Sequence, residues 1–252
     1  MHDMAPEEID ELLAALGPVP ELRLQTEAIV LADIVKGSTS DHDARLPFGD
    51  CALMYATQYL QVSVDHLSAW RALFSDAKYA PSFAQMTLLR SAIETAARAR
   101  WLVDAGQAPA ERAHRGALCQ LESAVEVRKF VETDAGNEML PRVRIRERAL
   151  KKVMARHGYA AGRLNSVDIA EKYGLGAWAW RYTSGYAHAR EWAITSGTQG
   201  EVAYGIRPGQ RRVNTSATPR TVIDLTKLTA GLAIQAHNEI VAYAGGYANA
   251  PG

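Results

Sequence analysis

One short segment places three side chains suited to phosphate chemistry at helical spacing. Ser184 follows Arg181 by three residues, and His188 follows Ser184 by four. Because the seven residues from first to last are close to two helical turns, about 10.5 Å of rise, the three side chains share one face of a helix. An arginine fork matches two phosphate oxygens, and an imidazole can move a proton near neutral pH. This stripe predicts a site that acts on a phosphodiester.

RNA fits such a site because it carries its own nucleophile, the ribose 2′-hydroxyl. The protein then has to supply only a proton-transferring group and a cation near the phosphate. We therefore predict Arg181, His188 and Ser184 as catalytic residues, and Gly185 leaves room for a ligand to approach closely. No histidine stands at ligand spacing from another histidine or a cysteine, so we predict no metal and no cofactor.

A second polar pair, Arg90 and Glu94, lies four residues apart within an otherwise apolar helical stretch. A buried ion pair requires further polar partners, and Ser184 or His188 would supply them. On one interpretation Arg90 and Glu94 support the catalytic residues. On the other, these side chains form a satisfied polar network that only fixes the register of two helices.

Two stretches resemble a known group of proteins. Arg181-Tyr-Thr-Ser-Gly-Tyr-Ala-His188 resembles the motif of the HEPN superfamily, an arginine and a histidine separated by four to six residues. With Arg90-Ser-Ala-Ile-Glu94-Thr-Ala-Ala it is also similar to a set of uncharacterised bacterial helical proteins related to that superfamily. The match covers about thirty residues. The residue after the arginine is commonly Asn, His or Asp in active members, and here it is Tyr182.

The resemblance implies an all-helical bundle with metal-independent ribonuclease activity, of the kind found in toxin–antitoxin, abortive-infection and CRISPR systems. It implies that Arg181 and His188 are the catalytic pair, and that two copies of the chain face each other to form one cleft. A homodimer, an RNA substrate and an antitoxin or other partner protein are the expected partners.

Charge is unevenly distributed along a chain whose formal net charge is zero. Residues 1–50 contain eleven acidic and three basic residues, whereas residues 139–220 contain fifteen basic and five acidic ones. Many of these basic residues lie on the predicted helix 139–157, on all sides of it. Such a helix can neutralise the phosphates of a nucleic acid without distinguishing its bases. Alternatively, this surface is simply solvated, or acidic and basic faces meet within the fold or across a dimer. The predicted nucleic-acid-binding residues are Arg142, Arg144, Arg148, Lys151, Lys152, Arg156, Arg207, Arg211 and Arg212.

Apolar residues recur every three or four positions along most of the chain, which predicts helices. The predicted helices are 6–16, 20–36, 50–75, 82–104, 109–133, 139–157, 166–173, 177–195 and 219–244, with 37–50 as a loop. The segment 201–216 alternates instead, and its central Pro208-Gly209 fits a type II turn.

These elements predict an all-α fold, an antiparallel helical bundle with a short late β-hairpin or extended arm. We expect a single helical domain over residues 1–252. Its parts would be acidic helices and a loop at 1–49, the bundle core at 50–196, the arm at 197–218 and the last helix at 219–245.

The chain's composition favours a cytoplasmic protein that contacts no membrane. The first ten residues are acidic and polar, unlike a signal peptide, and no apolar run approaches the roughly 20 residues that span a bilayer. Cys51 and Cys119 are the only cysteines, and both lie in apolar helical contexts. We predict that both are buried thiols in a reducing compartment.

Two other functions remain open at the level of sequence. A catalytically silent scaffold that dimerises or binds a partner protein would bury His188 against Glu94 or Arg90. A small-molecule-binding bundle would enclose an apolar cavity lined by Trp101, Trp178 and Tyr186.

Overall fold

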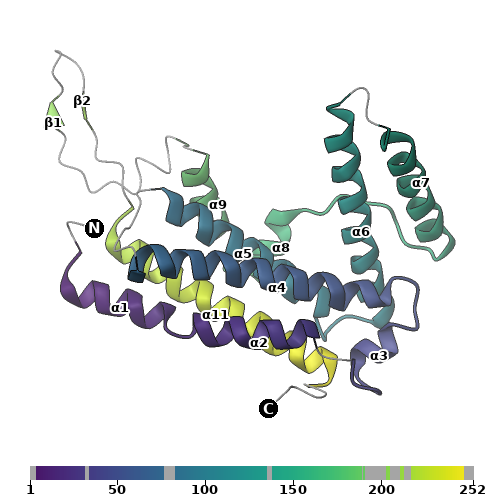
Figure 1. Cartoon of the computed structure of the whole chain (residues 1–252), viewed down its shortest axis with the longest axis horizontal. Coiled ribbons are helices and arrows are strands. Elements are labelled where there is room, and N and C mark those ends of the chain that lie inside the picture. Colours follow the sequence, from purple (N-terminus) through teal and green to yellow (C-terminus); the bar gives the residue numbers. More distant parts are fainter. Residues whose placement is uncertain are drawn as a thin grey trace. The chain divides into compact units, whose positions relative to one another are not determined.

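The computed structural model describes residues 4–31, 34–76, 83–134, 138–188, 190, 203–204, 211–212 and 217–246. This part of the chain is predominantly helical (Figure 1), which confirms the predicted all-α class. The helices are α1 (Pro6–Leu16), α2 (Val19–Leu31), α3 (Thr39–Asp43), α4 (Gly49–Arg71), α5 (Ala84–Val103), α6 (Pro109–Glu132), α7 (Leu140–Arg156), α8 (Ser166–Tyr173), α9 (Gly176–Ala187) and α11 (Pro219–Ala244). One π-helical turn, η1 (Ala72–Asp76), continues α4.

Start signals in the sequence correctly locate several helices. Helix α1 begins at Pro6, as predicted, and the carboxylate of Glu8 accepts a hydrogen bond of 2.9 Å from the backbone N–H of Ala5. Proline suits this position because its missing N–H would have no partner in the first turn. Helices α8 and α11 have the predicted bounds.

The predicted loop at 37–50 is partly wrong, because this segment contains α3 and the start of α4. Ser38 caps α3 by accepting a hydrogen bond of 3.2 Å from the N–H of Asp41. Gly37, at φ +83°, donates its own N–H to the Asp41 carboxylate. The polar composition that indicates a loop here serves instead to cap a short helix. Ile34, which falls within the predicted helix 20–36, lies beyond the end of α2 and is exposed.

Contacts group the chain into two compact units, each assembled from three segments. The first comprises Met1–Ala28, Tyr59–Arg98 and Val167–His237. Within it, the indole N–H of Trp70 donates to Thr226 Oγ1 over 3.1 Å, which joins α4 to α11. Ser63 Oγ donates to the Ala92 carbonyl over 3.0 Å, which joins α4 to α5.

Glu11 ties the acidic N-terminal segment of this unit to its last helix. The carboxylate accepts hydrogen bonds from Arg220, at 3.0 Å, and from Lys227. Acidic and basic segments therefore meet within the fold at this point, as one interpretation of the charge asymmetry expected.

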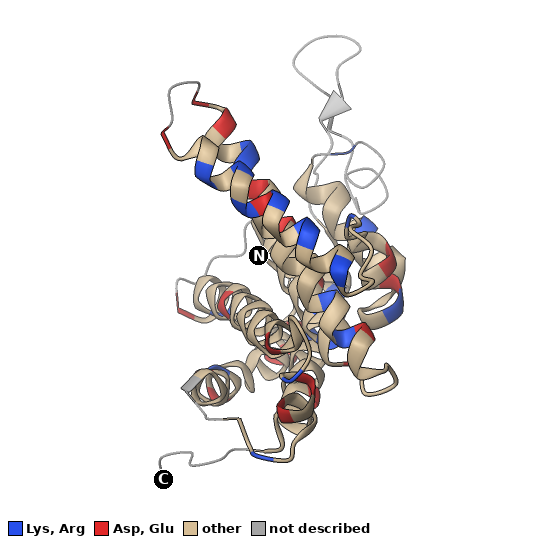
Figure 2. Cartoon of the chain, turned by 90° about the vertical axis from the view of Figure 1, so that its right-hand side faces the viewer, with Lys and Arg blue, Asp and Glu red and all other residues tan. Residues whose placement is uncertain are grey.

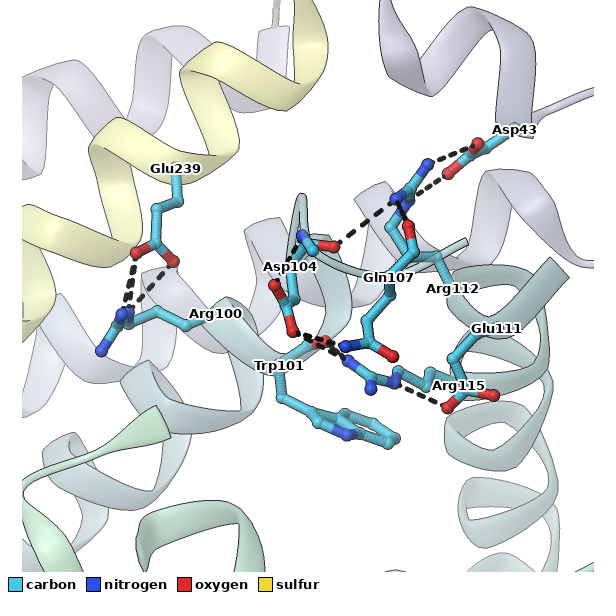
Figure 3. Close-up of polar contacts among 10 residues, drawn as sticks. Asp43, Arg100, Trp101, Asp104, Gln107, Glu111, Arg112, Arg115 and Glu239 are labelled. Carbon is cyan, nitrogen blue, oxygen red and sulfur yellow. Dashed lines mark hydrogen bonds and ion pairs between the residues drawn. The ribbon is translucent and has the colours of Figure 1, made fainter. Parts of the chain in front are cut away.

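The second unit comprises Ile29–Gln58, Ala99–Ser166 and Asn238–Gly252. Arginines of α6 complete the backbone where α5 ends (Figure 3): Arg115 donates to the Trp101 carbonyl over 2.5 Å, and Arg112 donates to the Gln107 carbonyl. The Trp101 carbonyl lies in the last turn of α5, where it has no partner inside the helix, and Gln107 lies in the loop between α5 and α6. Arg112 also forms a bidentate pair with the fully buried Asp43 of α3, at 2.6 and 3.0 Å.

Helices α6 and α7 form a hairpin within this unit (Figure 1). Met154 of α7 packs in one core cluster with Ala117 and Leu121 of α6. In Figure 2 the hairpin faces the viewer, and blue Lys and Arg segments recur along it. Glu147, largely buried on α7, accepts hydrogen bonds from Arg128, at 2.7 Å, and from Lys151, at 2.5 Å.

Both cysteines are buried free thiols, as predicted. Burial raises the pKa of Cys51 to about 12, with Asp50 as the next cause. The thiol therefore stays protonated at neutral pH.

Four residues of the predicted late arm have a described backbone. Strands β1 (Ala203–Tyr204) and β2 (Arg211–Arg212) pair in antiparallel register, Ala203 opposite Arg212. The turn at 205–210 lies outside the described residues, so a complete hairpin stays a prediction. Among the described helices, none is long and apolar enough to span a membrane.

Candidate functional site

Helix α9 presents the predicted stripe but ends earlier than predicted. It stops at Ala187, where a helix to residue 195 was expected, and His188 is its C-cap residue. The N–H of Arg190 donates to the Gly185 carbonyl over 2.8 Å, which closes a turn at the end of the helix. Such a bond occupies a carbonyl that a continuing helix would use. Residues 191–202 lie outside the described part.

An open pocket of about 410 Å³ lies along this stripe. All three predicted catalytic residues line it together with residues that the sequence did not single out. The described lining residues are Val167, Trp180, Arg181, Ser184, Gly185, His188 and Arg190. Arg181, Ser184 and His188 thus lie on one face and line one pocket, as their spacing predicts.

The charged groups of the pocket are accessible from solvent. Arg181, His188 and Arg190 are exposed, and Ser184 is half-buried. None of the described lining residues is acidic, so the pocket combines two permanent cations with an imidazole and a hydroxyl. Donors of this kind suit a bound phosphate or other oxyanion.

The pair on α5 reaches the motif helix through a tryptophan. Arg90 Nη2 lies 3.5 Å from Glu94 Oε2, which confirms the ion pair. The Trp180 indole N–H donates to the same Glu94 oxygen over 3.3 Å. The Arg90 guanidinium carbon stands 5.2 Å from the centroid of the Trp180 ring. Trp180, which itself lines the pocket, therefore connects this pair to the motif helix.

Comparison of the chain with protein-family models, with curated proteins and with solved structures gives no match. The resemblance to the HEPN superfamily therefore rests on the motif residues alone.

The predicted nucleic-acid-binding residues lie on α7 and on the late arm. The α7 side chains are all exposed: Arg142, Arg144, Arg148, Lys151, Lys152 and Arg156. Arg144 pairs with Glu132 at 3.0 Å and Lys151 with Glu147. Arg207 lies outside the described residues, and only the backbone of Arg211 and Arg212 is described. The structure does not place the two groups at one site.

The aromatic residues proposed to line a small-molecule cavity differ in exposure. The Trp178 side chain is exposed, whereas Tyr186 is buried and packs against Phe83 and Tyr182 at ring-centroid distances of 6.1 and 5.1 Å. Burial raises the pKa of Tyr186, with the hydrogen bond from Tyr182 as the next cause. Trp101 lies in the second unit, where Arg115 covers its ring. Because Trp178 is exposed, it does not line an enclosed cavity.

Two described pocket residues, Val167 and Arg190, escaped the sequence analysis. Arg190 follows the stripe by only two residues, so a second arginine near the motif was a visible signal. Its place in the pocket depends on the turn that follows Ala187, which helical periodicity does not predict. Trp180 stands four residues before Ser184 and therefore extends the same stripe by one turn.

Among the described residues, no group of three or more His, Cys, Asp and Glu side chains could hold a metal ion.

Proposed function

We propose that the α9 pocket binds a phosphodiester of RNA and cleaves it, and that the protein is an effector ribonuclease of the HEPN type. The supporting observation is that Arg181, Ser184 and His188 line one solvent-open pocket together with Arg190. A silent scaffold would instead bury His188 against Glu94 or Arg90, and His188 is exposed. Tyr182, which stands where active members of the superfamily commonly carry a polar residue, is not among the described lining residues of this pocket.

The proposed reaction is an internal transesterification. The 2′-hydroxyl loses its proton, its oxygen bonds to phosphorus, and the bond from phosphorus to the 5′ oxygen breaks as that oxygen gains a proton. In this proposal His188 carries one of the two proton transfers and water the other. Arg181 and Arg190 bind the non-bridging oxygens, whose charge increases in the transition state. Ser184 donates a hydrogen bond that orients the phosphate.

The first test is cleavage of a fluorescent single-stranded RNA in EDTA. We expect Arg181→Ala and His188→Ala each to lower the rate by about 10²- to 10⁴-fold, the usual contribution of a positioned acid–base group. His42→Ala and Arg163→Ala are matched controls, since both side chains are exposed and neither lines the pocket. Equal traces of cleavage in all five proteins would contradict the proposal and favour the scaffold.

We further propose that α7 holds the RNA backbone. Arg142, Arg148 and Lys152 are exposed on this helix. Removing a side chain that contacts a phosphate makes the binding affinity less sensitive to salt. Each alanine substitution should reduce the slope of log affinity against log salt by about 0.7 on single-stranded RNA. An unchanged slope in all three variants would remove α7 from the interface.

A homodimer in which two copies share one cleft is the remaining part of this proposal. Mixing Arg181→Ala protein with His188→Ala protein tests it, because a shared cleft rebuilds one intact pair in mixed dimers. Recovery of activity on mixing would support sharing. Two inactive proteins that stay inactive when mixed, although sedimentation shows mixed dimers, would contradict it.

A further inference from the structure

Trp180 is the one large aromatic ring among the described lining residues of the pocket. It precedes Ser184 by one helical turn and neighbours Arg181 in sequence, so an aromatic surface and the cationic groups open into the same space. A nucleotide offers the matching combination, a flat base joined through its sugar to a phosphate.

The indole is held in place before any ligand arrives. Its N–H is bonded to Glu94, and Arg90 lies over its ring. Glu94 is in turn paired with Arg98, with 3.5 Å between Arg98 Nη2 and Glu94 Oε1. A ring fixed in this way loses little rotational freedom on binding. Because the N–H is already occupied, the ring can contact a base only through its π surface or its edge.

We propose that Trp180 stacks on the base next to the phosphate held by Arg181, so that the pocket takes an unpaired nucleotide of single-stranded RNA. This inference rests on the proposed function and adds the substrate class. A base within a duplex is stacked on both sides and is not available to the ring. Stacking also tolerates any base, because every base has a π face. Arg90 and Glu94 are then positioning residues that act through Trp180.

The test is the affinity for an oligonucleotide whose 2′-hydroxyls are methylated, which prevents cleavage, offered as a single strand and as a duplex. One stacked base contributes about 1–3 kcal/mol, so Trp180→Ala should weaken single-strand binding by about 5- to 150-fold. Duplex binding should stay unchanged. Trp180→Phe should keep most of the affinity, because it retains a ring, and it serves as the second variant should Trp180→Ala fail to fold.

Trp178→Ala is the matched control, since Trp178 is an exposed tryptophan of α9 outside the pocket lining. It should bind like the unmodified protein. Full single-strand affinity in Trp180→Ala, or an equal loss for single strand and duplex, would overturn the stacking.

Arg181→Ala, measured alongside, separates the two proposals. Weaker binding in Arg181→Ala with no change in Trp180→Ala overturns the stacking and supports the phosphate site. Weaker binding in Trp180→Ala with no change in Arg181→Ala supports the stacking and contradicts the proposed function.

Discussion

At the scale of single residues, the most deeply buried charges belong to a network outside the candidate site. Asp43 is fully buried, and its carboxylate accepts hydrogen bonds from Nε and Nη2 of Arg112. Its Oδ2 also accepts a hydrogen bond of 2.8 Å from the Tyr243 hydroxyl. Burial raises the pKa of Tyr243, with the Asp43 carboxylate as the next cause. Three helices, α3, α6 and α11, therefore meet at one carboxylate.

Removal of that carboxylate should strongly destabilise the fold. Asp43→Ala leaves the buried Arg112 without its counter-charge, and breaking a buried pair in this way costs about 3–5 kcal/mol. Tyr243→Phe removes one hydrogen bond to a charged group and should cost about 1.5–3 kcal/mol. Urea unfolding measures both free energies.

Glu27→Gln is the comparison for this prediction, because it breaks the exposed pair of Arg23 and Glu27. Exposed pairs contribute about 0–1 kcal/mol. A loss in Asp43→Ala no larger than that in Glu27→Gln would mean that the buried network does not stabilise the fold.

At the scale of elements, a glycine sets how closely α6 approaches the start of α4. A Cβ atom on Gly116 would lie 2.9 Å from the Phe48 carbonyl oxygen and 2.9 Å from the Ala52 nitrogen. Both are backbone atoms, so the helices themselves would have to move. Gly231, inside α11, has open space at the same position.

The two glycines should respond in opposite directions to the same substitution. We expect Gly116→Ala to lower the free energy of unfolding by about 1–3 kcal/mol through overpacking. Gly231→Ala should raise it by up to about 1 kcal/mol, because alanine is the better helix former. Thermal unfolding of both variants checks this, and a stabilised Gly116→Ala would refute the close approach.

The α6–α7 hairpin should lose part of its stability in acid. The hydrogen bond from Lys151, and after it that from Arg128, holds the pKa of Glu147 below its ordinary value. A carboxyl whose pKa is lower in the folded state stabilises the fold above its unfolded pKa, about 4.3. That contribution disappears as the pH falls through the folded value.

Urea midpoints of the unmodified protein and of Glu147→Gln, measured from pH 7 to pH 3, test this linkage. The unmodified protein should be the more stable above about pH 4.3, and the difference should shrink below it. A difference that stays constant over the whole range would show that Glu147 contributes through packing and not through its charge.

The sequence predicted elements well where a local signal and a periodic apolar face agreed. Pro6, Ser166 and Pro219 mark helix starts that the structure confirms. The prediction of a loop at 37–50 was partly wrong, because the polar residues that are typical of loops also cap short helices. The sequence placed Arg181, Ser184 and His188 correctly because helical spacing alone determines their common face. It could not place Arg190, because this residue lies beyond the end of α9, where helical periodicity no longer applies.

At the scale of the whole molecule, the net charge is zero, but acidic and basic side chains are unevenly distributed over the structure. Several carboxylates are used inside the fold: Glu11 binds Arg220 and Lys227, and Glu147 binds Arg128 and Lys151. The pocket on α9 has no acidic residue in its described lining. Local charge of this kind steers an anion even when the total charge does not.

The central claim is that this pocket cleaves RNA with the ribose as nucleophile. The most direct measurement is the chemistry of the product ends, in EDTA, for an RNA oligonucleotide and for DNA of the same sequence. We expect RNA fragments that end in a 2′,3′-cyclic phosphate and a 5′-hydroxyl. These fragments should be absent with His188→Ala, and the DNA should stay intact. Cleavage of the DNA at a similar rate, fragments with 3′-hydroxyl ends, or RNA that stays whole with folded protein would contradict it.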